Sequence, residues 1–112
     1  MKSFLLPAVC AVSILLLGVI GPASAGDAVA PVVVIIEGSA FVPDTVTIKA
    51  GTEVVWRNKD SVPHTITADD GSFDSGSLNQ GDEFKRKFIA PGTYKYSCDI
   101  HAYMSGNVIV KE

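Results

Sequence analysis

The segment GTYKYSCDIHAYMSG, residues 92–106, holds the two features that decide the fold of this chain. Its first half alternates aromatic with polar side chains up to Cys98, which is the period-two spacing of a strand with one buried face. Its second half places His101 and Met104 at steps of three residues after that cysteine. A thiol, an imidazole and a thioether in one loop at the end of a strand predict a metal site.

The same spacing could instead mark one face of a short helix, with Cys98 and Met104 as ordinary core residues. The turn residues Pro91-Gly92 on one side and Gly106-Asn107 on the other leave room only for a tight loop, which favours the metal interpretation. A second imidazole, His64, lies 34 positions before Cys98. The fold would have to bring it to the same place.

Together these residues form a set of one thiolate, two imidazoles and one thioether: Cys98, His64, His101 and Met104. Thiolate and thioether are soft ligands that favour copper, above all Cu(I), and imidazole suits both copper oxidation states. Structural zinc prefers four strong donors, for which a thioether is a poor substitute. A closed set of four ligands leaves no open position for a substrate, so we expect no catalytic residues and no enzyme.

The N-terminal region has the pattern of a secretory signal peptide. Lys2 precedes an almost wholly apolar run over residues 4–20, and small residues follow up to Ala25. We therefore expect residues 1–25 to be cleaved and residues 26–112 to form one domain. The alternative is an uncleaved membrane anchor, because the apolar run reaches the lower edge of the length that spans a bilayer.

Export determines how the cysteine is interpreted. After cleavage the chain keeps a single cysteine, Cys98, which can form no internal disulfide and stays free to bind a metal. The expected product carries eight basic and twelve acidic residues, a formal charge of −4 with neutral histidines. This mild acidity disfavours nucleic-acid binding and helps solubility.

The rest of the expected domain consists of short extended segments that recur about every ten residues between turn residues, which indicates an all-β sandwich. The first of them, residues 32–36, is β-branched throughout and suits a strand buried on both faces. The candidate strands are residues 32–36, 45–49, 53–58, 64–68, 83–89, 93–98 and 107–111.

One candidate strand conflicts with this pattern. Phe84 and Phe88 would share its inward face with Arg86 between them, and a buried arginine is uncommon. A β-bulge, or a strand that begins after Arg86, would remove the conflict.

Three motifs of the expected domain form a further pattern: Val62-Pro63-His64, Ala90-Pro91-Gly92-Thr93-Tyr94 and Cys98-Asp99-Ile100-His101-Ala102-Tyr103-Met104. In them the chain resembles the cupredoxins, or type 1 blue copper proteins, and looks most similar to the amicyanin branch and its plastocyanin relatives. The resemblance implies a Greek-key β-sandwich of seven or eight strands. It also implies one copper ion, Cu(I) or Cu(II), with His64, Cys98 and His101 in a trigonal plane and Met104 as the long axial ligand.

The function implied by the resemblance is a one-electron carrier, exported to a bacterial periplasm and monomeric. Its redox partners would be a donor dehydrogenase, an acceptor cytochrome or oxidase, or both, reached through the ring edge of His101 and a small apolar patch around it. We expect no nucleic-acid partner and no stable membrane insertion after cleavage. The alternative is a periplasmic copper store or chaperone, which a single thioether in the expected domain disfavours.

Two positions depart from the family's usual pattern. An asparagine normally follows the first histidine ligand and braces the cysteine loop, whereas this chain has Thr65, whose hydroxyl can supply part of that bonding. A proline often follows the second histidine, whereas this chain has Ala102. These departures bear on the rigidity of the loop and on the reduction potential.

Overall fold

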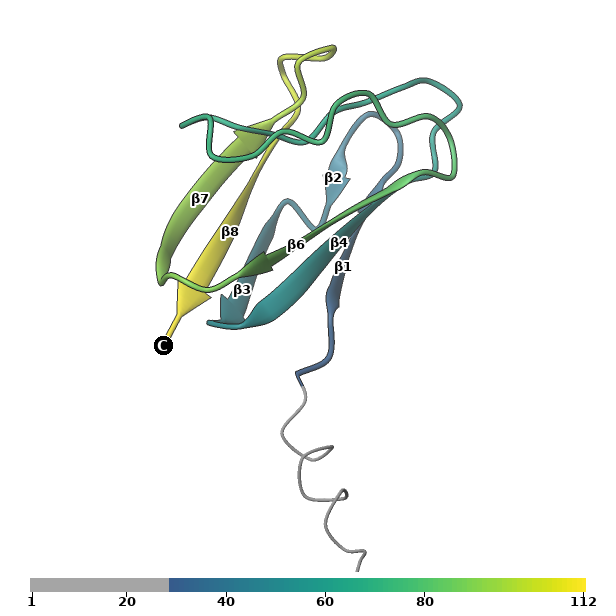
Figure 1. Cartoon of the computed structure of the whole chain (residues 1–112). Helices are drawn as coiled ribbons and strands as arrows, with labels where there is room; N and C mark the ends of the chain where they lie inside the picture. The colour runs from purple at the N-terminus through teal and green to yellow at the C-terminus, as the bar shows by residue number, and fades with distance from the viewer. Residues whose placement is uncertain (1–28) are drawn as a thin grey trace, which may run out of the picture.

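A computed structural model describes residues 29–112 and shows two facing β-sheets without helices in that part of the chain (Figure 1). The eight strands are β1 (Val32–Ile36), β2 (Phe41–Val42), β3 (Thr45–Lys49), β4 (Thr52–Asn58), β5 (Thr67–Ala68), β6 (Glu83–Phe88), β7 (Gly92–Ser97) and β8 (Ser105–Lys111). The predicted all-β sandwich is confirmed. The predicted signal peptide, residues 1–25, lies outside the described residues.

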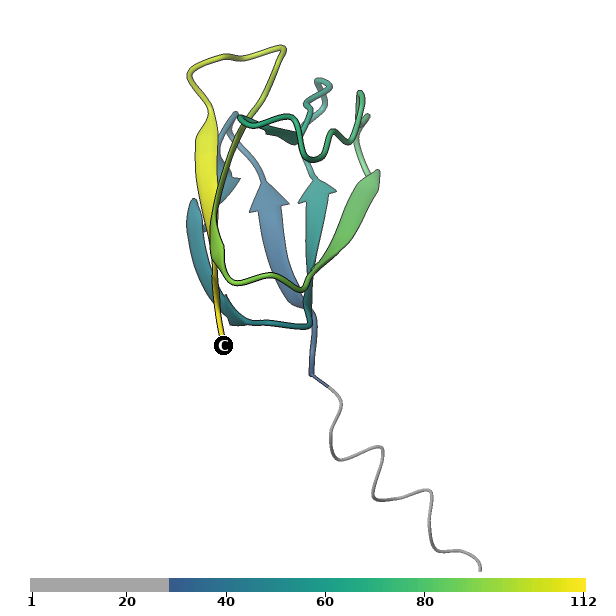
Figure 2. The same ribbon diagram turned by 60° about the vertical axis from the view of Figure 1, so that its left-hand side comes forward.

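Strand order is β2-β1-β4-β6 in one sheet and β3-β8-β7-β5 in the other, as the turned view shows (Figure 2). Strands β1 and β4 pair in parallel, and so do β3 and β8, whereas the hairpin β7–β8 is antiparallel. Across residues 29–112, no helix is long and apolar enough to cross a membrane. The connection over residues 59–82 and the loop over residues 98–104 lie at the same end of the sandwich (Figures 1 and 2).

Burial follows the alternation read from the sequence in most strands. In β3, Val46 and Ile48 are buried, whereas Thr45, Thr47 and Lys49 are exposed. The expectation that β1 is buried on both faces is wrong, because only Val34 and Ile36 are buried and Val33 is 39% exposed. A β-branched run fits any pleated, half-buried surface, so its composition does not fix two-sided burial.

The core below the loop end is built around Trp56, which is fully buried. Its ring centroid lies 5.4 Å from that of Tyr96 and 5.6 Å from that of Phe84. Tyr96 comes from β7 and Trp56 from β4, so this contact joins the two sheets. Aromatic pairs at this separation add stability beyond the area that they bury.

The conflict at Arg86 is resolved differently from both solutions that the sequence suggested. Strand β6 runs from Glu83 to Phe88 in unbroken register with β4, so it has no bulge and does not begin after Arg86. The guanidinium carbon lies 5.0 Å from the ring centroid of Phe73. Because β6 is an edge strand, a long cationic side chain can cover an aromatic face there while remaining half-buried.

The extended segment predicted over residues 64–68 is mostly not a strand. Only Thr67–Ala68 form β5, and His64 makes an isolated antiparallel bridge with Leu78. The backbone N–H of His64 donates to the Leu78 carbonyl (3.1 Å), and the Leu78 N–H donates to the His64 carbonyl (2.8 Å). Hydrogen bonds to a loop residue therefore satisfy the backbone N–H and carbonyl of His64. They hold His64 at the end of the sandwich.

The close approach of Tyr96 to Gly106 yields a stability prediction. A Cβ at Gly106 would overlap the ring carbon and hydroxyl of Tyr96 and would lie 2.8 Å from the Asp44 carbonyl oxygen. We expect Gly106→Ala to lower the free energy of unfolding by about 1–3 kcal/mol, measured by urea denaturation, because overpacking forces rigid neighbours apart. The neighbouring exposed control, Ser105→Ala, should change it by about 0.5 kcal/mol or less; equal effects would contradict the steric account.

Candidate metal centre

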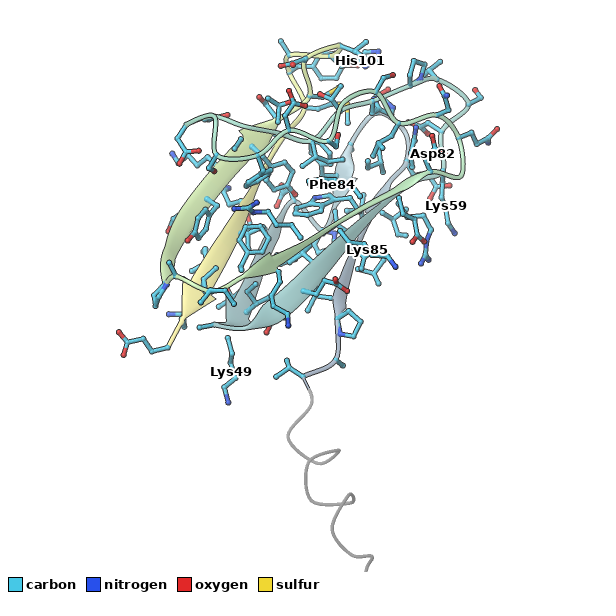
Figure 3. All side chains as sticks on the ribbon, viewed as in Figure 1. Lys49, Lys59, Asp82, Phe84, Lys85 and His101 are labelled. Atoms are coloured by element: carbon cyan, nitrogen blue, oxygen red, sulfur yellow. The ribbon has the colours of Figure 1, made fainter. Side chains whose placement is uncertain are left out.

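Three nitrogen and sulfur donors from two distant segments meet at the loop end of the sandwich. His64 comes from the connection after β4, Cys98 follows β7, and His101 lies in the loop that leads to β8. Their ligand atoms all lie within 4.8 Å of one another. Cys98 Sγ is 3.8 Å from His64 Nδ1 and 4.0 Å from His101 Nδ1, and Figure 3 shows His101 at the tip of this end.

Met104 belongs to the same loop and is 2% exposed. Its N–H donates to the His101 carbonyl (2.9 Å), and its carbonyl accepts from the Cys98 N–H (3.2 Å). These two bonds close residues 98–104 into a tight turn and exclude the short helix that the spacing also allowed. The thioether is therefore held on the loop that carries Cys98 and His101.

The Cys98 sulfur is buried and accepts two backbone hydrogen bonds. The donors are the N–H groups of Thr65 (3.3 Å) and His101 (3.4 Å). Burial raises the pKa of the thiol, but hydrogen bonds, led by those from the Thr65 and His101 N–H groups, outweigh it and lower the pKa to about 6. Since the thiolate is the form that binds metals, the protein holds this sulfur ready for a metal near neutral pH.

Thr65 braces the cysteine loop, as the sequence suggested for a hydroxyl at this position. Its Oγ1 accepts the Asp99 N–H at 2.8 Å, one residue beyond Cys98. The Thr67 hydroxyl lies 3.0 Å from the same oxygen. Threonine thus makes both links between the segments: its backbone N–H reaches the sulfur, and its side chain reaches the loop.

The two histidines differ in their access to solvent. His64 is fully buried, whereas His101 is half-buried and its ring centroid lies 6.0 Å from that of Tyr103, a side chain 74% exposed. Pro63 and Ala102, which adjoin His64 and His101 in the sequence, are exposed as well. The sequence analysis missed two further exposed apolar side chains at this end, Val62 (44%) and Ile100 (47%). Val62 and Ile100 lie within the two sequence motifs that contain the histidines, and this position could have identified them.

Sequence reasoning also missed Asp60, whose Oδ2 lies 2.9 Å from His64 Nε2. The Ser39 N–H lowers the pKa of this carboxyl most, burial opposes it, and bonds from His64 and Gly38 lower it further. The carboxyl is therefore ionised at neutral pH. The position of this acidic residue, four before a candidate histidine ligand, could have identified it from the sequence.

The donor atoms fit copper. A buried sulfur close to two imidazole nitrogens, with a thioether on the same loop, matches the ligand types that favour copper over zinc or magnesium. Within the described part of the chain, no carboxylate belongs to this group, so hard oxygen ligands do not compete with the soft ones.

Known proteins share this arrangement of sequence and fold. The family model described as a cupredoxin-like domain matches residues 9–110. The chain is 36% identical over 76 residues to amicyanin-alpha of Methylorubrum extorquens, a match that covers 63% of this chain and 64% of that protein. It is 38% identical over 84 residues to the plastocyanin of Scenedesmus fuscus, covering 63% of this chain and 86% of that one.

The chain is also similar to part of a larger protein of known structure. The copper-containing nitrite reductase of Thermus scotoductus superposes with a TM-score of 0.69 and 32% identity, covering 73% of this chain. Only 22% of that larger protein is covered, so this chain corresponds to one part of it.

The brace at Thr65 leads to a prediction for the metal-free protein. We expect Thr65→Val to lower the free energy of unfolding by about 1 kcal/mol and to speed hydrogen exchange of the Asp99 amide, because that N–H loses its acceptor. Urea denaturation and amide exchange measure the two effects. Thr67→Val is the control, since it keeps the acceptor; the same acceleration in both variants would refute the brace.

Proposed function

The chain belongs to the cupredoxin-like domain family, and we propose that it is a small type 1 copper protein that carries single electrons between redox partners. The observation that carries this proposal is the meeting of one cysteine sulfur and two imidazole nitrogens within 4.8 Å at the end of a β-sandwich. When bound, copper supplies a one-electron couple between Cu(I) and Cu(II).

In this proposal His64, Cys98 and His101 would hold the ion, and the thioether of Met104 would be the weak fourth donor. The donor types support it, since a weak axial thioether beside two imidazoles and a thiolate is the ligand set of blue-copper electron-transfer sites. The hydrogen bonds that close the loop from Cys98 to Met104 hold three of the four proposed donors on one tight turn.

His101 is the proposed route for electrons to and from partners. It is the one histidine of the pair that reaches the surface, because His64 is fully buried. The apolar end surface, which we define as Val62, Ile100 and Tyr103, lies on the two segments that carry the histidines, and its Tyr103 ring is 6.0 Å from that of His101. Such a surface loses water readily against another protein and would bring a partner close to the imidazole edge.

We further propose that the protein is not an enzyme and acts outside the cytoplasm. The four-donor set leaves no position for a substrate, and the match to nitrite reductase covers too little of that enzyme to transfer its activity. The apolar run before Ala25 supports residues 1–25 as a signal peptide, residues 26–112 as the copper domain and a bacterial periplasm as the location. The proposed partners are a donor dehydrogenase and an acceptor cytochrome or oxidase, met by a monomer.

Optical and EPR spectra of the oxidised, copper-loaded protein test the ligand assignment. We expect an intense blue colour that Cys98→Ser abolishes, because the colour depends on the thiolate. Met104→Leu should keep the colour and raise the reduction potential, because losing the axial donor disfavours Cu(II). A Met104→Leu variant with a lower potential, or a blue Cys98→Ser variant, would refute the assignment.

Stopped-flow electron exchange separates a carrier from a copper store. A carrier should exchange electrons rapidly with an added redox protein and should keep its copper in the presence of a chelator. A store or chaperone would rest as colourless Cu(I), yield its metal to the chelator and exchange electrons slowly. Fast metal loss with slow electron exchange would therefore overturn the proposed function.

A further inference from the structure

The ring of His64 has a second nitrogen, which faces away from Cys98. This nitrogen, Nε2, lies 2.9 Å from Oδ2 of Asp60, while Nδ1 lies 3.8 Å from the Cys98 sulfur. His64 is fully buried, and the Asp60 side chain is 16% exposed. Water therefore does not reach the ring, and the carboxylate is the partner of Nε2.

The Asp60 carboxylate is itself held by a backbone turn between β1 and β2. The Gly38 N–H donates to Oδ1 at 2.8 Å, and the Ser39 N–H donates to Oδ2 at 2.9 Å. Both residues have left-handed backbones, with φ of 65° and 54°. Successive N–H groups that converge in such a turn form a concave site for an anion.

The connection that carries Asp60 is fixed from its other side by Asn58, which is fully buried. The Asn58 side-chain oxygen accepts the Asp60 N–H at 2.9 Å, and its amide nitrogen donates to the carbonyls of Val62 (3.0 Å) and Leu78 (2.9 Å). Asp60 is thus anchored by three backbone and side-chain bonds before it contacts His64. Its position is a property of the fold rather than of the histidine.

Both oxygens of the Asp60 carboxyl group already accept backbone N–H groups, so the group acts as the acceptor and Nε2 of His64 is the donor in the bond between the two side chains. In the neutral ring the other nitrogen, Nδ1, then carries the free lone pair, and it is the nitrogen that faces Cys98. A metal takes the unprotonated nitrogen of an imidazole. Asp60 thereby selects the tautomer that can bind a metal beside the cysteine sulfur.

We propose that Asp60 is a positioning residue of the metal centre, which fixes the tautomer and ring angle of His64 and places a negative charge behind it. The expected effect of Asp60 on the reduction potential rests on the proposed copper function. The expected tautomer of His64 does not. A carboxylate hydrogen-bonded to a ligating histidine raises the basicity of the ligand. It should therefore favour Cu(II), the more highly charged state, over Cu(I).

The first experiment uses the unaltered, metal-free protein. Nitrogen-15 NMR of its histidine rings reports which nitrogen of His64 carries the proton. We expect the proton on Nε2, in slow exchange with solvent because the His64 ring is fully buried and hydrogen-bonded to Asp60. A proton on Nδ1 would overturn the proposal, whether or not the protein proves to bind copper.

The second experiment compares Asp60→Asn with a matched control, Asp82→Asn. Both variants remove one negative charge from a carboxylate that accepts a backbone N–H; Asp82 accepts that of Asn79 at 2.9 Å. Figure 3 shows Asp82 well separated from His101. An asparagine at position 60 cannot accept from Gly38, Ser39 and His64 together with one oxygen, so the control separates the loss of these contacts from the loss of one negative charge.

We expect Asp60→Asn to weaken Cu(II) binding 10- to 100-fold, the usual effect of losing such a partner, and to weaken Cu(I) binding less. Each tenfold difference between the two affinities raises the potential by about 59 mV. Asp82→Asn should leave both affinities unchanged. Equal affinities and potentials in the two variants would overturn the proposal, whereas an absence of copper binding in the unaltered chain would instead refute the proposed function.

Discussion

The hydrogen bond from the Thr65 N–H to the Cys98 sulfur is the contact on which the site depends. It joins two segments that lie 33 residues apart, and it does so at the atom that would carry the chemistry. The sulfur acceptor keeps its negative charge only because such donors surround it in a buried place. Together with the bond from the Asp99 N–H to Thr65 Oγ1, it ties the segment that carries His64 to the loop over residues 98–104.

The sandwich below provides a rigid base for that crossing. Trp56 and Tyr96 pack between the sheets, and β7 continues directly from Tyr96 to the cysteine. Because protein interiors are close-packed, a shift of either sheet would displace Tyr96. The Cys98 sulfur, two residues further along the chain, would move with it.

Patterns local to one segment were readable from the sequence, and contacts between segments mostly were not. Alternation gave β3 correctly, and turn residues on both sides gave a loop between Cys98 and Met104 rather than a helix. The pairing of His64 with Leu78, the place of Arg86 over Phe73 and the contact of Asp60 with His64 all depend on tertiary neighbours. No period or propensity within a single strand encodes such neighbours, so they had to be observed.

The edges of the two sheets affect how copies of the protein meet. Each sheet ends on one side in a strand of two residues, β2 or β5; of the two longer edge strands, β6 exposes the charged side chains of Glu83, Lys85 and Lys87, and β3 exposes Thr45, Thr47 and Lys49. Short or charged edges offer a poor template for another chain to add a strand. A crowded solution of this protein should therefore resist fibril formation and remain dispersed.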